Sequence, residues 1–356
     1  MDKNNKIQVS FSAINKKYEE NIPQFVEKEG IKEYILYGED NQLPEYLYGL
    51  YNEVSTLRTI IEGTSDYVLG NEIKCNVSGF DVELNQKGDT LREIIKLISR
   101  DYLLYGGYAL QIIRNKIGDI REIYYLDFKN VRTSKKNDVI YYSEEFGKKY
   151  VRTNKTLKFP KFVAEDKTSP TSVLYVKNEK TKTYPIPRYS GALKSIEIER
   201  QISDYHLSAL ENGFNGSYII NFLNGVPDDE VKWEIEKNVS EKFCGSKNAG
   251  RILLNFANGK DNATTVDKLD VEDFGTKYES LNKWSKEQIF TAFQCSPIIF
   301  GSIAENKGFS RLEFTEAFEL YNKTIVYNIQ QMIIDNFDKI FGIKNSIEII
   351  PFSLEK

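Results

Sequence analysis

The chain contains a single histidine, His206, and this limits the chemistry it could perform. A zinc-protease helix needs two histidines, and a serine-protease type of triad would depend on this one ring. His206 lies in a predicted helix beside Leu207, so we interpret it as a packing residue. Neither a zinc ribbon nor a disulfide framework is predicted, because no Cys-x-x-Cys pair links the three distant cysteines, Cys75, Cys244 and Cys295. We expect no metal site, no cofactor and no catalytic residue.

A glycine-containing loop, Gly245-Ser-Lys-Asn248-Ala-Gly250-Arg251-Ile252, resembles a phosphate-binding loop in outline. Such a loop needs a lysine for the phosphates and a hydroxyl for Mg²⁺ after its last glycine, where this chain has Arg251 and Ile252. A phosphate-binding loop also follows a strand and opens a helix, whereas this one follows a predicted helix and opens a predicted strand. We interpret it as a helix C-cap and turn. A nucleotide-dependent enzyme is therefore the least favoured function.

Four acidic residues form a cluster that could bind a divalent cation: Asp267, Asp270, Glu272 and Asp273. Most of them lie at or just inside a predicted helix start, where each acidic side chain is favourable by about 0.3–1 kcal/mol without any metal. Helix capping is the preferred interpretation, and an acidic ring on the surface is the alternative.

The composition is that of a globular protein with an uneven charge distribution. The 356 residues are 40% apolar and 28% charged, and this length suggests two or three structural units. The net charge is −5 over residues 1–100, +8 over 101–189 and −7 over 190–356. The basic middle part could bind nucleic acid, but a lysine-rich solvated sheet surface is the simpler interpretation.

No secretory signal or stretch of ~20 apolar residues is found, so we expect a protein without membrane contact, cytosolic or bound to a particle.

Hydrophobic periodicity predicts an α+β fold. Residues 1–30 are expected to form an arm, and helices are expected over 41–70, from about 89 to 106, over 190–212, from 270 to about 294 and over 310–340. The helix of 190–212 is expected to have an inward and an outward face: inward Leu193, Ile196, Ile202, Tyr205 and Leu210, and outward Lys194, Glu197, Glu199, Arg200 and Asp204. Short strands predict a small antiparallel sheet within 106–180: a hairpin of 108–114 with 120–126, another of 139–142 with 150–151, and a single strand at 173–176. A compact α/β insert is expected over 213–268, with strands at 217–222 and 251–256. Pro297 should end the helix that begins at 270. Residues 301–308 show no hydrophobic periodicity, and a last strand is expected at 346–352.

Several segments occur in an order that resembles the portal proteins of tailed phages. They span about 300 residues and run as follows: Gly38-Glu-Asp-Asn-Gln-Leu-Pro44, Gly70-Asn-Glu-Ile73, Tyr105-Gly-Gly-Tyr-Ala-Leu-Gln-Ile-Ile-Arg114, Gly118-Asp-Ile-Arg-Glu-Ile-Tyr-Tyr-Leu126, Glu211-Asn-Gly-Phe-Asn-Gly216, the loop with Gly245, Asn248, Gly250 and Arg251, and Gln288 to Gly301 followed by Phe309-Ser310. Each piece alone is weak, but their order and spacing make the match specific.

The resemblance implies a portal-type fold with named parts. These would be an N-terminal arm (1–30), a mixed wing with antiparallel hairpins (31–189), two stem helices (190–212 and 269–296), a small α/β clip (213–268), a tunnel-loop region (297–309) and a C-terminal wing helix and strand (310–356). On this template the loop at 245–251 is a turn of the clip, and the acidic cluster is the start of the second stem helix. The helical crown of many relatives is expected to be minimal or absent, because the chain ends soon after the long helix.

The same resemblance implies a ring, usually of twelve subunits, at one vertex of the capsid in the virion. Double-stranded DNA would pass through it without sequence specificity, with Glu305, Asn306 and Lys307 at the tip of the loop that faces the DNA. Implied partners are the terminase large subunit, the major capsid or scaffold protein and a tail connector, with assembly in the host cytoplasm.

Charge and amphipathicity agree with a ring but leave another class of function open. A channel coated with Lys and Arg would bind phosphates and slow the DNA, so a net charge of −7 over 190–356 suits a low-friction lining. Contacts between subunits of a closed ring would also cover helix faces that a single chain leaves exposed. The alternative from another class is a nucleic-acid-binding module that uses the basic sheet of 101–189.

Overall fold

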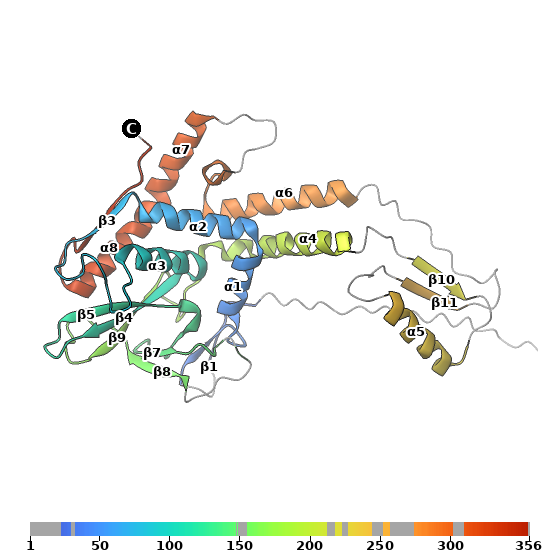
Figure 1. Ribbon diagram of the computed structural model, residues 1–356, viewed down its shortest axis with the longest axis horizontal. Coiled ribbons are helices and arrows are strands. Elements are labelled where there is room, and N and C mark those ends of the chain that lie inside the picture. The colour runs from blue at the N-terminus through green and yellow to red at the C-terminus, as the bar shows by residue number, and fades with distance from the viewer. Residues whose placement is uncertain are drawn as a thin grey trace, which may run out of the picture. The chain divides into compact units, whose positions relative to one another are not determined.

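The structure is a computed structural model that describes residues 23–29, 33–146, 148, 155–211, 218–222, 227–243, 252–256, 274–301 and 310–354. The chain divides into two compact units (Figure 1). The larger unit comprises residues 22–197 and 284–356, and the smaller one contains residues 198–283 together with 1–21. The predicted mixture of helices and small sheets is confirmed.

Three helices near the N-terminus form the centre of the larger unit's core. They are α1 (Leu43–Glu53), α2 (Ser55–Leu69) and α3 (Leu91–Tyr105). The helix predicted over 41–70 is divided, because Val54 adopts an extended conformation, while its predicted end at Gly70 is confirmed with φ of 60°. The helix predicted from about 89 to 106 is confirmed. Thr90 and Glu93 form a capping box at its start, and Gly106 takes a left-handed conformation at its end.

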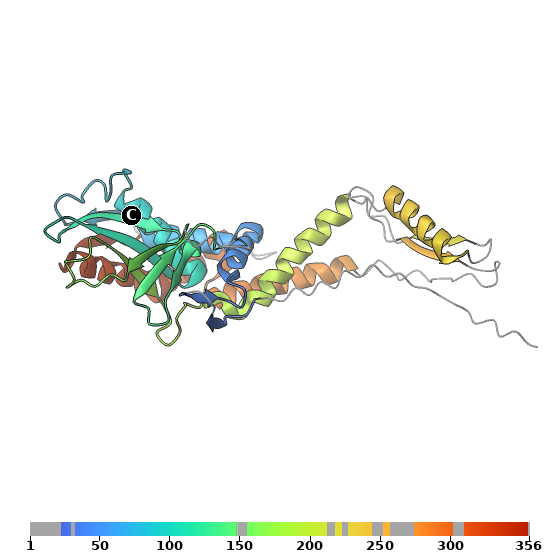
Figure 2. The ribbon, with the colours of Figure 1, turned by 90° about the horizontal axis from the view of Figure 1, so that it is seen from below.

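An antiparallel sheet packs under these helices. It has the order β5–β4–β9, with β4 (Gly107–Arg114), β5 (Ile120–Leu126) and β9 (Thr171–Lys177), and it confirms the predicted hairpin and the strand near 173–176. Helix α3 lies on this sheet and α2 lies on α3 (Figure 1). Seen from below, the strands lie in front of these helices (Figure 2). The layers are therefore sheet, helix and helix.

A second antiparallel sheet contains β6 (Val131–Thr133), β7 (Val139–Tyr142) and β8 (Leu157–Pro160) in that order. The predicted partner of 139–142 at 150–151 lies outside the described residues, and the described partners are β6 and β8. There are two smaller antiparallel pairs among the described residues. β1 (Glu27–Glu29) pairs with the next strand, β2 (Ile35–Tyr37), and β3 (Glu72–Cys75) pairs with the distant C-terminal β12 (Ile347–Ile350). The expected closing strand is thus confirmed.

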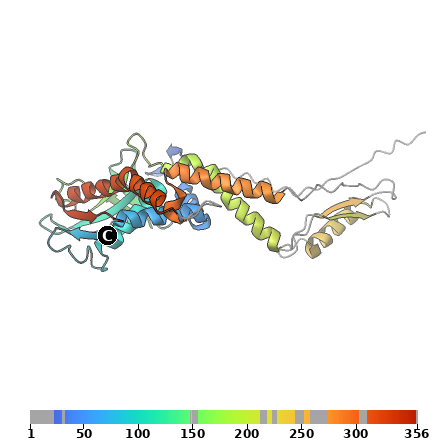
Figure 3. The same ribbon diagram turned by 90° about the horizontal axis from the view of Figure 1, so that it is seen from above.

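The long C-terminal helix is confirmed, with one irregularity. Helices α7 (Arg311–Tyr321) and α8 (Tyr327–Phe341) are joined through a π-helical segment, Asn322–Val326, into one continuous rod (Figure 3). Two buried polar contacts tie the rod to α2. The hydroxyls of Thr64 and Tyr321 are 2.8 Å apart, and the amide of Gln330 donates to the carbonyl of Val68 at 3.0 Å.

The remaining helices and strands follow the predicted order. Helix α4 (Leu193–Glu211) follows a 3₁₀ turn at Arg188–Ala192, and α6 covers Phe274–Phe293. In the smaller unit β10 (Tyr218–Phe222) and β11 (Ile252–Phe256) pair in parallel, with α5 (Asp229–Phe243) between them in the chain. This βαβ arrangement confirms the predicted α/β insert.

Arg132 is a buried cation that joins the N-terminal segment to the second sheet. Its side chain is 1% exposed, and its guanidinium donates to the side-chain and main-chain oxygens of Asn41 and to the carbonyls of Lys129 and Val131. Its Cζ lies 4.8 Å from the ring centroid of Phe146. Burial lowers the pKa of the guanidinium. The desolvation cost is thus offset by carbonyl acceptors and aromatic faces.

We expect Arg132→Met to lower the free energy of unfolding by about 2–4 kcal/mol, since several buried carbonyl oxygens would lose their donors. The control is Arg121→Met on the exposed side of β5, which should change stability by less than about 0.5 kcal/mol. Urea titration followed by circular dichroism measures both. Equal stability of the two variants would show that Arg132 has no such role.

Candidate assembly surface

The predicted site residues all lie outside the described residues. This applies to the turn with Gly245, Asn248, Gly250 and Arg251, to the acidic cluster of Asp267, Asp270, Glu272 and Asp273, and to the loop tip with Glu305, Asn306 and Lys307. The structure describes the segments that flank them. Strand β11 begins at Ile252, α6 begins at Phe274, and Gly301 and Ser310 stand on either side of the loop.

The chain that enters this loop follows a sharply defined path. Helix α6 ends at Phe293, Gln294 has φ of 55°, and Ser296 is extended with ψ of 135°. The prediction that Pro297 excludes helix from the residue before it is confirmed. A 3₁₀ turn, Pro297–Phe300, then ends at Gly301, which has φ of 78° and favours glycine.

Aromatic packing on α2 fixes this turn. The hydroxyl of Tyr67 donates to the carbonyl of Ile299 at 2.7 Å. The ring of Phe300 lies 6.0 Å from the rings of Tyr67 and Tyr321, and a Cβ added to Gly63 would lie 2.7 Å from it. The absence of a side chain at Gly63 therefore makes room for Phe300.

The chain that leaves the loop is fixed by a helix cap. The hydroxyl of Ser310 accepts a hydrogen bond from the backbone N–H of Glu313 at 3.3 Å. One and two turns into α7, Phe314 and Phe318 pack on each other, and Phe318 packs on Tyr67. Both flanks of 302–309 thus rest on the α2 core.

Exposed apolar side chains are unevenly distributed over the helices. None of the large apolar residues exposed in the described part of the chain lies on α1, α2 or α3. Nine lie on the later helices: Tyr205 and Leu207 on α4, Val231 and Trp233 on α5, Leu281 and Trp284 on α6, Leu312 and Leu320 on α7, and Tyr327 on α8. Single exposed apolar residues are common, whereas large contiguous apolar patches mark interaction surfaces, so these helices are the candidate sites of contact with another molecule.

The outer part of α4 departs from the predicted orientation. Tyr205, expected to face inward, is 48% exposed, although its ring stacks on Tyr278 of α6 at 4.7 Å. His206, interpreted as a packing residue, is exposed, and its ring meets the rings of Tyr205 and Tyr278 edge-on. Leu207 is 59% exposed. Because apolar residues lie on several faces of α4, its sequence does not identify one buried face.

Two glutamates of α4 are also placed differently from the prediction. Glu197 and Glu199 were expected to face outward, and both are buried. Glu197 accepts a hydrogen bond from the hydroxyl of Tyr46 at 3.3 Å, so a polar partner from α1 compensates part of its burial. The positions of charged residues therefore did not identify the solvent-exposed face of this helix.

Several lysines of the basic region form ion pairs with the acidic N-terminal part of the chain. Lys135 pairs with Glu29 and Lys158 pairs with Glu33. Lys129 pairs with Glu45 of α1 at 3.4 Å. The segment before α1 thus neutralises part of the positive charge on the second sheet.

Among the described residues, potential metal ligands are dispersed, and the Cys295 thiol is protonated at neutral pH. No group of three or more His, Cys, Asp or Glu residues among them could hold a metal ion. Burial raises the pKa of the Cys295 thiol to about 12, so it is not a nucleophile at neutral pH. Within the described part of the chain, no helix is both long and apolar enough to cross a bilayer.

The packing at Gly63 yields a matched pair of variants. We expect Gly63→Ala to lower the free energy of unfolding by about 1–2 kcal/mol, because Phe300 must be displaced. Gly49→Ala, in α1 with open space around the new Cβ, should raise it by about 0.5–1 kcal/mol through helix propensity. Urea titration measures both, and hydrogen exchange at 297–301 should accelerate only in Gly63→Ala. Stabilisation by both substitutions would contradict the proposed packing role.

Comparison with known proteins places these features in a family. The family model described as phage portal protein matches residues 84–342. An uncharacterized protein of Rickettsia bellii (strain RML369-C) is 35% identical over 86 residues, which are 23% of this chain and 22% of that protein. The chain thus spans about a fifth of the length of that relative.

Solved structures of gene transfer agent (GTA) particles share the fold. A chain from the virion of the native particle superposes with a TM-score of 0.56 at 14% identity, covering 86% of this chain and 83% of that one. A chain from the neck of the native particle, computed with C12 symmetry, gives 0.54 at 18% identity, covering 88% and 85%. The neck of the empty particle, computed with C6 symmetry, gives 0.53 at 15% identity, covering 88% and 85%. Because the family model spans most of the sequence, this chain belongs to the phage portal protein family.

Proposed function

We propose that this protein forms a closed homo-oligomeric ring in a virion, at the connection between head and tail, through which double-stranded DNA passes. The observation that carries the proposal is the concentration of exposed apolar side chains on α4 to α8 in a chain of the portal family. Related folds occur in particle necks computed with C12 and C6 symmetry, which supports a ring and, as its finer form, twelve subunits. We propose a structural role without enzymatic activity.

A ring gives the exposed helix faces a function. In a closed ring each subunit presents two different faces, one to each neighbour, so apolar side chains left open by one chain become buried by the next. We assign α4 and α6 to the stem (190–212 and 269–296) and the βαβ unit to the clip (213–268). The sheets with α1–α3 form the wing (31–189), together with the C-terminal rod (310–356).

The tunnel-loop region, 297–309, is proposed to face the DNA. Its flanks are fixed by Phe300 and Ser310, so the force of passing DNA would be transmitted to the α2 core rather than to a flexible junction. Lys307 is the one basic residue between Glu305 and Ser310, which suits a contact that does not hold phosphate tightly. The net charge of −7 over 190–356 supports a repelling lining.

Further partners follow from the same assignment. We propose that the clip contacts the terminase large subunit during packaging and later a tail connector, and that the wing contacts the major capsid or scaffold protein. Assembly would take place in the host cytoplasm before the ring becomes part of the virion.

The runner-up function is nucleic-acid binding by the basic sheet. The ion pairs of Lys135 with Glu29 and Lys158 with Glu33 weigh against it, since a phosphate would have to displace a carboxylate at each position. Phosphate binding releases counterions, so a dedicated site would show a steep dependence on salt.

The ring is tested by placing the same charge at two positions of α4. We expect the full-length chain to form rings with a central hole in negative-stain electron microscopy, with matching masses in mass photometry. Leu207→Glu should raise the dissociation constant of the ring by about tenfold or more, because a charge would enter an apolar interface. Gln201→Glu, also exposed on α4, should assemble like the wild type. A wild-type chain that stays monomeric at every salt concentration, with Leu207→Glu identical to it, would refute the proposal.

The runner-up is tested with Lys135→Gln combined with Lys158→Gln. For a portal, the affinity for double-stranded DNA should change by less than about twofold, because these lysines already have carboxylate partners. A nucleic-acid module would lose about tenfold or more in affinity, and its slope of log K against log salt would fall by about 2. Fluorescence anisotropy gives this slope when DNA binding is measured at several salt concentrations between roughly 50 and 300 mM.

A further inference from the structure

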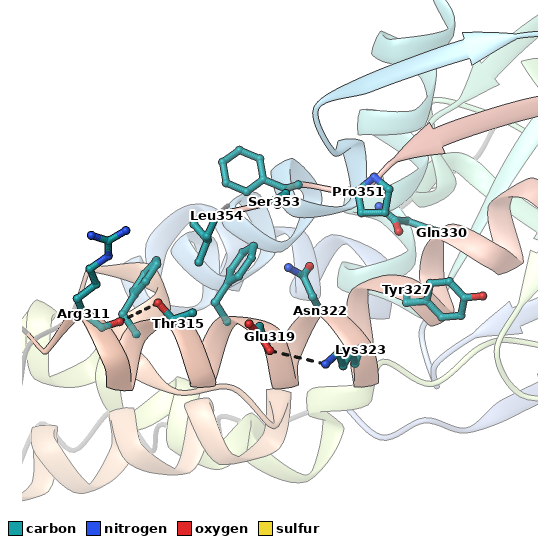
Figure 4. A pocket seen from close by; sticks show the side chains of 13 residues that line it. Arg311, Thr315, Glu319, Asn322, Lys323, Tyr327, Gln330, Pro351, Ser353 and Leu354 are labelled. Carbon is teal, nitrogen blue, oxygen red and sulfur yellow. Dashed lines mark hydrogen bonds and ion pairs between the residues drawn. The ribbon is translucent and has the colours of Figure 1, made fainter. Parts of the chain in front are cut away.

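An elongated groove runs along the C-terminal rod. One wall is formed by α7, the π-helical segment and the start of α8, and the other by the tail that follows β12, Pro351–Leu354 (Figure 4). The cavity measures about 1140 Å³. This exceeds the ~300–1,000 Å³ of typical small-ligand pockets, so the groove has the dimensions of a site for an extended chain segment.

The groove has an apolar floor and a polar rim. Phe314 and Phe318 stack with ring centroids 6.1 Å apart, and Phe352 meets Phe318 edge-on at 5.9 Å while remaining 41% exposed. Glu319 and Lys323 form an ion pair of 3.6 Å along the rim. The π-helical segment at Asn322–Val326 lies within this wall, and such irregularities are frequent at functional sites. A segment with one apolar and one polar face would fit.

The N-terminal arm contains such a segment. Residues 7–14 read Ile-Gln-Val-Ser-Phe-Ser-Ala-Ile, in which apolar and polar side chains alternate from Ile7 to Ala13. This period of two places Ile7, Val9, Phe11 and Ala13 on one face of an extended chain. Residues 7–15 carry no charge and are flanked by Lys6 and Lys16.

The length of the segment matches the groove, and the segment carries no charge of its own. The helical wall from Arg311 to Gln330 is about 28 Å long at 1.5 Å per residue, and eight extended residues span about 26 Å. The charged side chains that line the groove are Arg311, Glu319 and Lys323, and Glu319 and Lys323 pair with each other. An uncharged stretch such as residues 7–15 therefore requires no new ion pair in the groove.

The short connection between the segment and the described chain limits which copy can supply it. The described chain begins at Pro23, just before β1, and Figure 1 shows β1 on the opposite side of α2 and α3 from α7. Residues 15–22 reach about 30 Å at most when fully extended. The sheet and helix layers between β1 and α7 are each about 10 Å thick, so passing them alone uses up this reach. The chain would also have to turn around the edge of these layers to enter the groove of its own subunit.

We propose that residues 7–14 of one subunit bind as an extended segment in the α7–tail groove of the next subunit, with Val9 and Phe11 on the apolar floor. This inference rests on the proposed ring, which places copies side by side and raises their effective concentration. It adds an exchanged arm as a specific link between neighbours.

A disulfide test distinguishes the arm from the ring. We combine Ser353→Cys in the tail with Val9→Cys on the apolar face, and compare it with Ser353→Cys combined with Ser10→Cys on the polar face. Since a shift by one residue reverses the face of an extended segment, the Val9→Cys pair should link chains about fivefold faster or more. Non-reducing gels and peptide mass spectrometry identify the bond, and mass photometry reports ring formation in the same samples.

Each outcome is decisive. Rings with covalent links between neighbours through position 9 support the inference. Rings in which both pairs link equally slowly overturn it while leaving the ring itself intact. A bond within one chain, or monomers without links, also overturns it, and the monomers would refute the ring as well.

A second measurement avoids cysteine substitutions. Trypsin cleavage after Lys16 and Lys17 should be about tenfold faster in a variant with Val9→Asp and Phe11→Asp, because a charged face cannot dock on the aromatic floor. Ser10→Asp with Ser12→Asp adds the same charge to the polar face and should digest like the wild type. Equal rates for both double variants would contradict docking by the apolar face.

Discussion

An apolar side chain on a helix is stable in water where another surface covers it, and this requirement separates the first three helices from the later ones. Helices α1 to α3 bury their large apolar residues between one another and the β5–β4–β9 sheet. Helices α4 to α8 present nine such residues to solvent. In a portal protein, the covering surface would be another subunit, so the fold of one chain is completed by assembly.

The larger unit supplies the rigid support that such an assembly needs. Arg132 holds the segment around Asn41 against the second sheet through carbonyl acceptors, and ion pairs from Glu29 and Glu33 extend this contact. In the same unit, Tyr67 and Phe300 fix the turn that precedes residues 302–309. Buried polar contacts with few alternatives favour one arrangement of these segments over others.

Local signals in the sequence predicted most elements, because their causes lie within a few residues. The capping residue Thr90, the helix stop at Gly70 and the break before Pro297 are examples, as is the alternation of the 108–126 hairpin. The order of short motifs predicted the family.

Features that depend on distant partners were not predictable. The break at Val54 and the π-helical segment carry no local signature, and the burial of Glu197 depends on Tyr46 of another helix. Tyr205 and Leu207 of α4 look like core residues in sequence, since an apolar position reads the same whether its own chain or a neighbour covers it. The residues expected at the clip turn, the acidic cluster and the loop tip lie outside the described part of the chain, and their roles stay proposals.

We expect neighbouring copies to cover the open faces of α4 to α8. A cryo-electron microscopy reconstruction of the assembled full-length chain would show these contacts. The expected result is a closed ring with an open axis, in which Leu207, Trp284 and Leu320 lie within contacts between adjacent subunits. A closed ring in which these three side chains remain in solvent, or particles that contain only separate chains, would contradict it.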